Sequence, residues 1–345
     1  MPRSPRPLRK VFVTRAIDPA ALARLLAAAE VEIWPGEMPP PIRQLRGALS
    51  HADAVISMVT DKIDAPLIAS APRLRVISNL AVGVDNIDLE AATRAGIAVG
   101  HTPGVLTEAT ADLAFGLLMA TARRIAEGDL QVRAGKWRTW GPMTLLGRDV
   151  HSATLGIIGF GAIGQAMARR ASGFGMRVLY LARRSNKPKA GRYGVATAVS
   201  LSRLLAEADF VSIHVPLTPE TRHMIGAREF SRMKPGAILI NTARGPVVDQ
   251  DAMVAALKSR RLAGAGLDVT DPEPIARRDP LLQLDNVVIT PHIGSASIAA
   301  RARMAAIAVA NVLDVFAGRL PEFCANPRVG LRPIDAASPR PANDR

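Results

Sequence analysis

The segment from Ala153 to Leu181 constrains the fold of this chain more than any other stretch. Its apolar run Leu155 to Ile158 enters a glycine turn directly, as a buried parallel strand does. Gly159, Gly161 and Gly164 follow with the spacing of a dinucleotide-binding turn. The first glycine permits a tight turn, the second lets a pyrophosphate approach the backbone, and the third lets a helix pack against the strand.

A helix predicted over Ala162 to Ser172 and a second strand over Met176 to Leu181 complete a strand–helix–strand unit around this turn. The helix N-terminus presents free N–H groups and the positive end of its dipole to a phosphate. This context favours a dinucleotide site over a glycine turn without a ligand. The cofactor-binding residues predicted here are Gly159, Phe160, Gly161, Ala162, Ile163 and Gly164.

The end of the second strand indicates which dinucleotide binds. An NAD site places Asp or Glu there to accept a hydrogen bond from the ribose 2′-hydroxyl, but this chain reads Ala182-Arg183-Arg184. A carboxylate would repel a 2′-phosphate, whereas a guanidinium attracts it. We therefore predict that these three residues bind NADP(H), with NAD(H) accepted at lower affinity. The alternative is that both arginines are solvated surface charges and that the site accepts either dinucleotide.

The size and composition of the chain indicate globular domains. Its 345 residues, 48% hydrophobic and 21% charged, are enough for two domains with separate cores. The one cysteine, Cys324, excludes an internal disulfide framework and fits a reducing compartment. The sequence contains no zinc-type ligand spacing and no HExxH motif, so we predict no metal site.

The net charge of +14 raises the question of a nucleic-acid partner. Much of the excess lies in the Pro-rich start and in the Pro- and Ala-rich end, and elsewhere the arginines are scattered without an aromatic-basic motif. We therefore predict no nucleic-acid partner and a general attraction for anionic ligands instead.

No apolar stretch is long enough to cross a membrane, because the strongest, Leu113 to Ala122, has ten residues. The basic start is followed directly by the strand-like Val11 to Thr14 rather than by the apolar segment of a signal peptide. We expect a cytoplasmic protein without a membrane partner. A short, Arg-rich transit peptide is the minor alternative.

The first hundred residues alternate strand and helix, which is typical of a parallel sheet with helices on both faces. The predicted strands are Val11 to Thr14, Val31 to Trp34, Ala54 to Val59, Leu74 to Ser78 and Ile97 to Val99. The predicted helices are Asp18 to Ala29, Ile42 to Ser50, Asp64 to Ser70 and Asp88 to Ala95. Asp18 followed by Pro19 has the form of an N-cap and first helical residue.

A second doubly wound sheet follows. Its six predicted strands are Leu155 to Ile158, Met176 to Leu181, Phe210 to Val215, Ala237 to Ile240, Gly264 to Val269 and Val287 to Thr290. An apolar helix, Thr107 to Ile125, links the two domains, and residues 127 to 152 have poor helical and strand periods. A last helix, Ser297 to Ala317, is predicted to pack back on the first domain.

The predicted fold class is therefore α/β, with two doubly wound parallel-sheet domains. A Rossmann cofactor domain is inserted in a flavodoxin-like substrate domain. Residues 1–103 and 297–325 form the discontinuous substrate-binding domain, residues 104–296 form the NADP-binding domain, and residues 326–345 are predicted to be a disordered tail.

Polar residues suited to carbonyl reduction collect where strands of the second domain end, and ligands of doubly wound sheets bind at that edge. Arg244 can polarise a carbonyl and hold a neighbouring carboxylate. His292 can give the proton, because the unperturbed imidazole pKa of about 6.5 is near neutrality. A carboxylate would orient the imidazole ring. Glu273 and Asp271 flank Pro272 on its two sides, and spacing alone does not separate them.

Other polar residues have less specific interpretations. His214 lines the adenine side of the cofactor or merely caps its strand. Asp268 contacts the cofactor or a backbone group. The remaining histidines, which have no partner motif and are interpreted as structural, are His51, His101, His151 and His223.

Five motifs, in chain order, resemble those of the D-isomer-specific 2-hydroxyacid dehydrogenases. They are Gly-Phe-Gly-Ala-Ile-Gly (159–164), His-Val-Pro-Leu-Thr-Pro-Glu-Thr (214–221), Asn-Thr-Ala-Arg-Gly (241–245), Gly-Leu-Asp-Val (266–269) with Asp-Pro-Glu-Pro (271–274), and Pro-His-Ile-Gly-Ser (291–295). The resemblance covers about residues 10 to 325. It implies that Arg244, Glu273 and His292 form the catalytic set, which favours Glu273 over Asp271.

The resemblance also implies residues that the spacing does not. Backbone amides of the loop Asn79 to Asp85 would hold the substrate carboxylate. The substrate-binding residues implied are Val82, Gly83, Arg244, Ser295 and Trp140. The further cofactor-binding residues implied are Thr107, Val215, Pro216, Thr221, Thr242, Ala243, Asp268, His292 and Gly294.

Within that family the chain is similar to glyoxylate and hydroxypyruvate reductases, through Lys136 to Pro142 and the Ala-Arg-Arg sequence. This implies NADPH-dependent reduction of a small 2-oxoacid to the D-2-hydroxyacid. It also implies a homodimer in which Trp140 reaches the neighbouring subunit's site. The alternatives are another D-2-hydroxyacid dehydrogenase, such as a phosphoglycerate dehydrogenase, or a non-enzymatic NAD(H)-sensing, corepressor-like binding protein.

Overall fold

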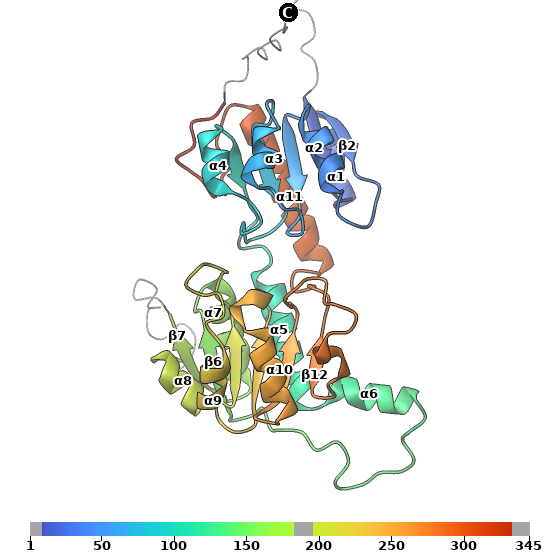
Figure 1. The fold of residues 1–345 in the computed structure, drawn as a ribbon, viewed down its shortest axis with the longest axis vertical. Helices are drawn as coiled ribbons and strands as arrows, with labels where there is room; N and C mark the ends of the chain where they lie inside the picture. Colours follow the sequence, from blue (N-terminus) through green and yellow to red (C-terminus); the bar gives the residue numbers. More distant parts are fainter. Residues whose placement is uncertain (1–8, 183–195, 333–345) are drawn as a thin grey trace, which may run out of the picture. The chain divides into compact units, whose positions relative to one another are not determined.

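The computed structural model describes residues 9–182 and 196–332 and divides into two compact units (Figure 1). Unit 1 comprises Met1–Leu106 and Ser297–Arg345, and unit 2 comprises Thr107–Ala296. Each unit is built on a parallel sheet with helices, which confirms the predicted α/β class. Unit 1 combines an early and a late part of the chain, so Figure 1 shows its blue to teal elements together with the red helix α11, Ile298–Phe316.

The sheet of unit 1 has the strand order β2-β1-β3-β4-β5, all parallel, which is the flavodoxin-like order. Its strands are β1 Lys10–Val13, β2 Glu30–Ile33, β3 Ala54–Ser57, β4 Val76–Asn79 and β5 Ala98–Gly100. Strands β3, β4 and β5 are buried throughout. Such strands are apolar without alternation because helices cover both of their faces.

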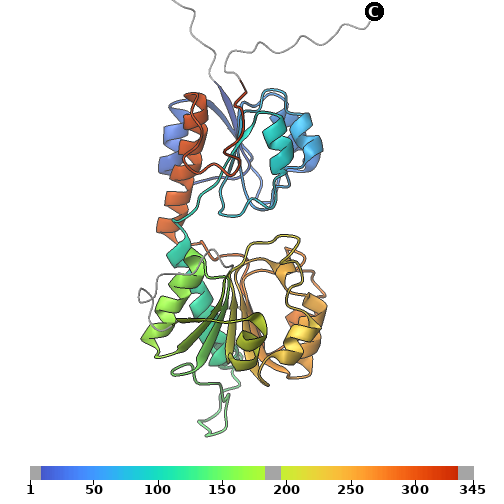
Figure 2. The same ribbon diagram turned by 90° about the vertical axis from the view of Figure 1, so that its left-hand side faces the viewer.

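Helices cover both faces of this sheet (Figure 2). Helices α1 (Pro19–Leu26) and α11 lie together on one face, and α2 (Ile42–Leu49), α3 (Ala65–Ala69) and α4 (Leu89–Arg94) lie on the other. The carboxylate of Asp18 accepts hydrogen bonds from the amides of Ala20 (3.0 Å) and Ala21 (3.1 Å), so this residue caps α1 as its sequence predicts.

The prediction of a disordered tail from residue 326 is wrong for residues 326–332. Asn326 is 7% exposed, and its amide nitrogen donates to the carbonyl of Ile97 (2.9 Å) and to the hydroxyl of Thr93 (3.0 Å). Its Oδ1 accepts from the amide of Val99 (2.8 Å). The buried asparagine therefore fastens the segment to unit 1, although the Pro-rich composition gave no sign of it. Residues 333–345 lie outside the described residues.

The sheet of unit 2 has seven strands in the order β12-β11-β10-β9-β6-β7-β8, all parallel in the described part of the chain. They are β6 Thr154–Ile158, β7 Arg177–Leu181, β8 Ala196–Ala198, β9 Phe210–Ile213, β10 Ala237–Asn241, β11 Leu262–Leu267 and β12 Val287–Ile289. The prediction of six strands missed β8. Its Ala-Thr-Ala sequence has three residues and no apolar run, so only its pairing with β7 identifies it.

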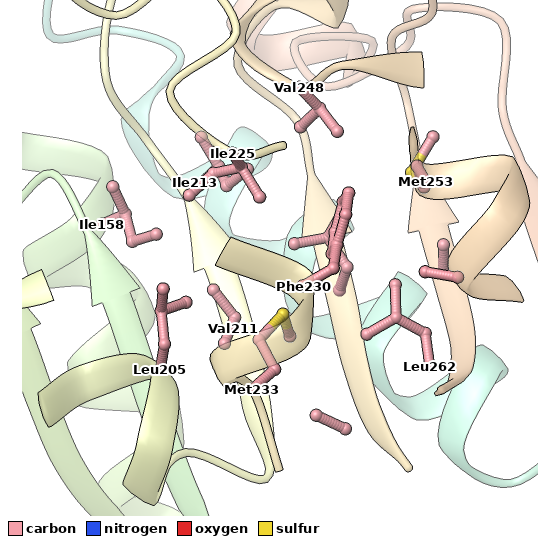
Figure 3. Packing of buried hydrophobic residues seen from close by; sticks show 14 of the residues in the cluster. Ile158, Leu205, Val211, Ile213, Ile225, Phe230, Met233, Val248, Met253 and Leu262 are labelled. Carbon is pink, nitrogen blue, oxygen red and sulfur yellow. The ribbon is translucent and has the colours of Figure 1, made fainter. Parts of the chain in front are cut away.

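Two apolar clusters hold the helices of unit 2 to the faces of this sheet. Helices α5 (Thr107–Ala122) and α7 (Ala162–Gly173) cover one face. The other carries α8 (Leu201–Glu207), α9 (Ala227–Arg232) and α10 (Gln250–Lys258), with Phe230 at the centre of the cluster in Figure 3. At about 25 cal/mol per Å² of buried apolar area, these clusters are the main stabilising contribution.

The link region differs from its prediction. Helix α5 ends at Ala122, Arg124 takes a left-handed conformation (φ 53°), and a separate helix α6 spans Ile125–Arg133. No residue of α6 is buried, so an apolar periodicity could not reveal it. Salt bridges of Arg124 with Glu127 (2.8 Å) and of Arg133 with Asp129 (2.8 Å) support it locally. In the described residues, no helix combines the length and hydropathy of a membrane span.

Candidate active site

The glycine turn lies at the carboxyl end of β6. Gly159 has φ 96°, and a side chain there would meet the His214 carbonyl oxygen at 2.6 Å. A Cβ on Gly164 would lie 2.2 Å from the Gly159 carbonyl oxygen, so only glycine lets α7 approach the turn. A Cβ on Gly161, the N-cap of α7, would meet nothing within 4 Å. The turn thus leaves an open approach to the N-terminus of a 12-residue helix.

This edge of the sheet fits a dinucleotide. The hydroxyl of Thr242, after β10, is buried and has no partner among the described residues, so it can bond to a ligand. Phe160 lies in the turn itself, and Ala162 and Ile163 are the first two residues of α7. Val215 and Ala243 are half-buried beyond the ends of β9 and β10, and Pro216 follows Val215. The buried Thr221 uses its hydroxyl within its own loop, donating to the Pro216 carbonyl (2.6 Å).

The residues predicted to select NADP follow β7 in the sequence. Ala182 is half-buried directly after that strand. Arg183 and Arg184 lie outside the described residues, so their selection of the 2′-phosphate stays a prediction.

Glu273 and His292 form a hydrogen-bonded pair. The His292 Nδ1 and a Glu273 carboxylate oxygen are 2.8 Å apart, and the other oxygen accepts from the Thr270 amide (3.2 Å). Because the partner is a carboxylate, Nδ1 carries the hydrogen and Nε2 is the atom left to exchange a proton. Asp271 instead donates its amide to the Gln250 side chain (2.9 Å). The structure thus places Glu273, not Asp271, on the imidazole.

Residues 290–294, the histidine loop, are held by the buried carboxylate of Asp268. Its two oxygens accept from the amides of Ile293 (2.8 Å) and Gly294 (2.7 Å) and from the hydroxyl of Thr290 (2.6 Å). The His292 amide donates to the Asp268 carbonyl (3.0 Å), and His292 has φ 55°. A left-handed conformation is costly for a non-glycine residue, so these bonds hold His292 in a strained geometry. Asp268 therefore contacts backbone groups, one of its two predicted interpretations.

A buried asparagine shapes the loop that carries Arg244. The Asn241 side chain accepts from the Ala243 amide (3.0 Å) and donates to the Arg244 carbonyl (2.9 Å). A Cβ on Gly245 would lie 1.9 Å from the Thr270 carbonyl oxygen, so glycine lets this loop approach the segment that leads to Glu273. The guanidinium of Arg244 donates to the Ala243 carbonyl (2.8 Å).

His214 has a structural environment. Its Nε2 lies 2.8 Å from the Ser212 hydroxyl, and its amide donates to the Ile158 carbonyl (2.7 Å). Burial lowers the pKa of His214 to about 4, so the ring is neutral at pH 7. Of its two predicted interpretations, these contacts match the one in which it caps its strand.

The loop after β4 in unit 1 presents backbone amides. We call residues 79–84 the amide loop. The Asn79 side chain, fully buried, donates to the Gly83 carbonyl (2.9 Å) and to the Asn86 side chain (3.0 Å). The amide N–H groups of Val82 and Gly83 have no acceptor among the described residues. Such N–H groups suit an anion.

Three predicted site residues take no part in the hydrogen bonds described above. Thr107 is the first residue of α5, and Ser295 is half-buried after the histidine loop. Trp140 is 78% exposed. Their predicted roles stay predictions.

Two asparagines that organise the site, Asn79 and Asn241, were absent from the predicted site residues. Each is the buried last residue of a buried strand, and each bonds to the backbone of the loop that follows. A polar residue closing an apolar run was a signal that could have found both.

Comparison with known proteins agrees with this geometry. Residues 115–294 match the family model described as D-isomer specific 2-hydroxyacid dehydrogenase, NAD binding domain. A glyoxylate reductase of Korarchaeum cryptofilum is 50% identical over 321 residues, which cover 93% of this chain and 96% of that protein.

Solved structures are similar along most of the chain. A protein from Thermus thermophilus is 50% identical with a TM-score of 0.86, covering 92% of this chain and 99% of that one. An NADPH-dependent glyoxylate/hydroxypyruvate reductase of Sinorhizobium meliloti, in complex with NADP and malonate, is 30% identical with a TM-score of 0.82, covering 94% and 99%. The motifs, the site geometry and these similarities together show that the chain belongs to the D-isomer-specific 2-hydroxyacid dehydrogenase family.

Proposed function

We propose that this protein uses NADPH to reduce a small 2-oxoacid, either glyoxylate to the achiral glycolate or hydroxypyruvate to the D-2-hydroxyacid. The observation that carries the proposal is the 2.8 Å contact between His292 and Glu273 at a sheet edge that fits a dinucleotide. Bound NADPH would supply the hydride to the 2-carbon. The carbonyl oxygen would take its proton from Nε2 of His292, so that the 2-oxoacid, NADPH and one proton give the 2-hydroxyacid and NADP⁺.

The other groups of the site bind the substrate or orient His292. Arg244 polarises the carbonyl through its planar guanidinium. Glu273 fixes the imidazole ring and stabilises its protonated form. The amides of Val82 and Gly83 in unit 1 hold the carboxylate. Unit 1 is thus the substrate-binding domain and unit 2 the nucleotide-binding domain.

The preference for NADPH rests on the sequence after β7. Arg183 and Arg184 stand where an NAD site has a carboxylate. The Sinorhizobium meliloti enzyme, described as NADPH-dependent, supports the same preference.

Steady-state kinetics with both nucleotides tests the proposal. Purified protein is assayed with NADPH and NADH against glyoxylate, hydroxypyruvate, pyruvate and 3-phosphohydroxypyruvate. We expect the largest kcat/KM with NADPH and one of the first two substrates. A higher kcat/KM with NADH would overturn the cofactor assignment. Nucleotide binding without reduction of any 2-oxoacid would favour a sensor over an enzyme.

We also propose that the protein is a homodimer. Helix α6 and the segment after it expose large apolar side chains: Leu130, Val132, Trp137, Trp140 and Met143 are 55–78% exposed. A large exposed apolar surface indicates an interface. Light scattering at micromolar concentration should give twice the chain mass, and Trp140→Glu should lower it. A monomeric wild type would contradict the proposal.

A further inference from the structure

Three consecutive peptide carbonyls of the amide loop are each held by a hydrogen bond. The Thr102 amide donates to the Ala81 carbonyl (2.8 Å). The His101 Nδ1 bonds to the Val82 carbonyl (2.8 Å), and the Asn79 side chain donates to the Gly83 carbonyl (2.9 Å).

Holding a carbonyl also fixes the amide of the following residue. In a trans peptide, the C=O of one residue and the N–H of the next lie in one plane and point in opposite directions. The bond to the Val82 carbonyl therefore sets the direction of the Gly83 N–H, and the bond to the Ala81 carbonyl sets that of the Val82 N–H. A hydrogen bond at the oxygen also polarises the peptide and strengthens its N–H as a donor.

His101 differs from the other two donors. The Thr102 donor is a backbone amide, which every residue except proline supplies. The Asn79 side chain also serves the core through Ser57 and Asn86. The ring of His101 makes one hydrogen bond in the described part of the chain, and that bond goes to the amide loop.

The backbone of His101 is fixed on both sides of its Cα. Its amide donates to the Phe323 carbonyl (3.1 Å), and its carbonyl accepts from the Asn311 side chain (3.3 Å). Because a carbonyl can only accept, the bond to Val82 requires the hydrogen on Nδ1. The ring is thus a donor held by the segment after β5 and directed at one peptide.

We propose that His101 is a positioning residue for the substrate: by donating to the Val82 carbonyl it aims the Gly83 N–H at the carboxylate of the 2-oxoacid. This inference rests on the proposed function. It replaces the interpretation of His101 as a merely structural histidine. In this proposal, the affinity of the amide loop for the substrate carboxylate depends on His101, although the His101 side chain does not contact the substrate.

The first test compares three variants. His101→Leu removes the donor, His101→Asn keeps an amide donor near the position of Nδ1, and His101→Gln moves that donor one bond further out. We expect His101→Leu and His101→Gln to raise the KM for the 2-oxoacid about tenfold, with kcat within about threefold of the wild type. His101→Asn should restore most of the affinity. The Kd of NADPH should not change in any of them.

An unreactive ligand separates binding from catalysis. Oxalate carries two planar carboxylates and resembles glyoxylate, so its Kd for the nucleotide complex should rise with KM. His51→Leu is the matched control in unit 1, because His51 pairs with Glu32 (3.8 Å) away from the amide loop. A fall in kcat with unchanged KM and unchanged oxalate Kd in His101→Leu would overturn the proposal.

A spectroscopic readout does not depend on activity. In protein labelled with ¹⁵N-glycine, the Gly83 amide signal should shift and exchange faster with solvent in His101→Leu, and it should stay near its wild-type position in His101→Asn. If the wild type reduces no 2-oxoacid, the proposed function fails while this spectrum still tests His101. An unchanged Gly83 signal in His101→Leu would refute the positioning role. If His101→Leu does not fold, the contrast between His101→Asn and His101→Gln gives the same decision.

Discussion

The amide loop of unit 1 and the histidine loop of unit 2 hold their functional groups in opposite ways. In the histidine loop, a buried carboxylate accepts from backbone amides, and the group presented is a side chain, His292. In the amide loop, side chains and one amide donate to backbone carbonyls, and the groups presented are the N–H groups of Val82 and Gly83.

Because of this difference, the two loops should respond differently to substitution. A presented side chain is removed by one mutation, so the loss falls on the chemical step. A presented amide survives every substitution of its own residue except one by proline, which has no N–H. Its function is therefore tested by mutating the side chains that support it, and the loss falls on binding.

His292→Ala should produce the largest loss. Removing the proton donor should lower kcat by roughly 10²–10⁴-fold. The Kd of NADPH should change far less, and fluorescence titration checks it beside steady-state kinetics. Nearly intact activity in this variant would remove His292 from the chemistry.

Asp268→Asn should act on the same step through the loop. The amides of Ile293 and Gly294 donate to the two different carboxylate oxygens of Asp268. An asparagine has one acceptor oxygen, so its NH₂ group would face one of these two N–H groups and could not accept a hydrogen bond from it. We expect kcat to fall about 10- to 100-fold although His292 is still present. Thr290→Val removes a single bond to the same carboxylate and should lose less. If Asp268→Asn changed KM as much as kcat, the histidine loop would not act on the chemical step alone, and this outcome would contradict the contrast between the two loops.

Asn79→Ala should act on binding and stability instead. The buried side chain supports the Gly83 carbonyl and bonds to Ser57 and Asn86, so its loss should lower the free energy of unfolding by about 2 kcal/mol. The KM for the 2-oxoacid should rise several-fold, with kcat affected less. Chemical denaturation and kinetics measure the two effects. A loss confined to kcat would contradict the assignment.

His214 should affect stability alone, and only in acid. Its folded pKa of about 4 lies below the unfolded value near 6.5, so the unfolded state binds the proton first as pH falls. Stability should therefore decrease between about pH 6.5 and pH 4 by up to about 3 kcal/mol, with no further contribution below pH 4. Denaturation of His214→Gln should show a smaller pH slope, while its kcat between pH 6 and 9 should match the wild type.

Much of the fold could be predicted because its signals are local. The strand, the glycine turn and helix α7 are contiguous, and apolar runs mark the buried strands. Strand β8 and helix α6 were missed because neither carries an apolar pattern; β8 depends on its pairing partner and α6 on surface ion pairs.

The site also has parts that the sequence could predict and parts that it could not. His292 and Arg244 could be proposed from their chemistry at the ends of strands. Spacing left Asp271 and Glu273 equivalent, and the resemblance favoured Glu273, which the structure places on the imidazole. The amide loop acts through backbone N–H groups, so its residue types alone gave no sign of a binding role, and only the family resemblance indicated it. The role of Asn326 was hidden because its partners Thr93, Ile97 and Val99 are more than 220 residues away in the sequence.

Unit 1 is completed by residues near the end of the chain, which affects the order in which the two units fold during synthesis. The Ser78 hydroxyl donates to the Ala308 carbonyl of α11, and Asn326 joins Thr93, Ile97 and Val99. A ribosome delivers all five strands of unit 1 long before these last partners emerge, whereas unit 2 is complete at Ala296. The unit translated first is therefore the one finished last, and until α11 is synthesised the sheet face that α11 covers stays exposed on the nascent chain.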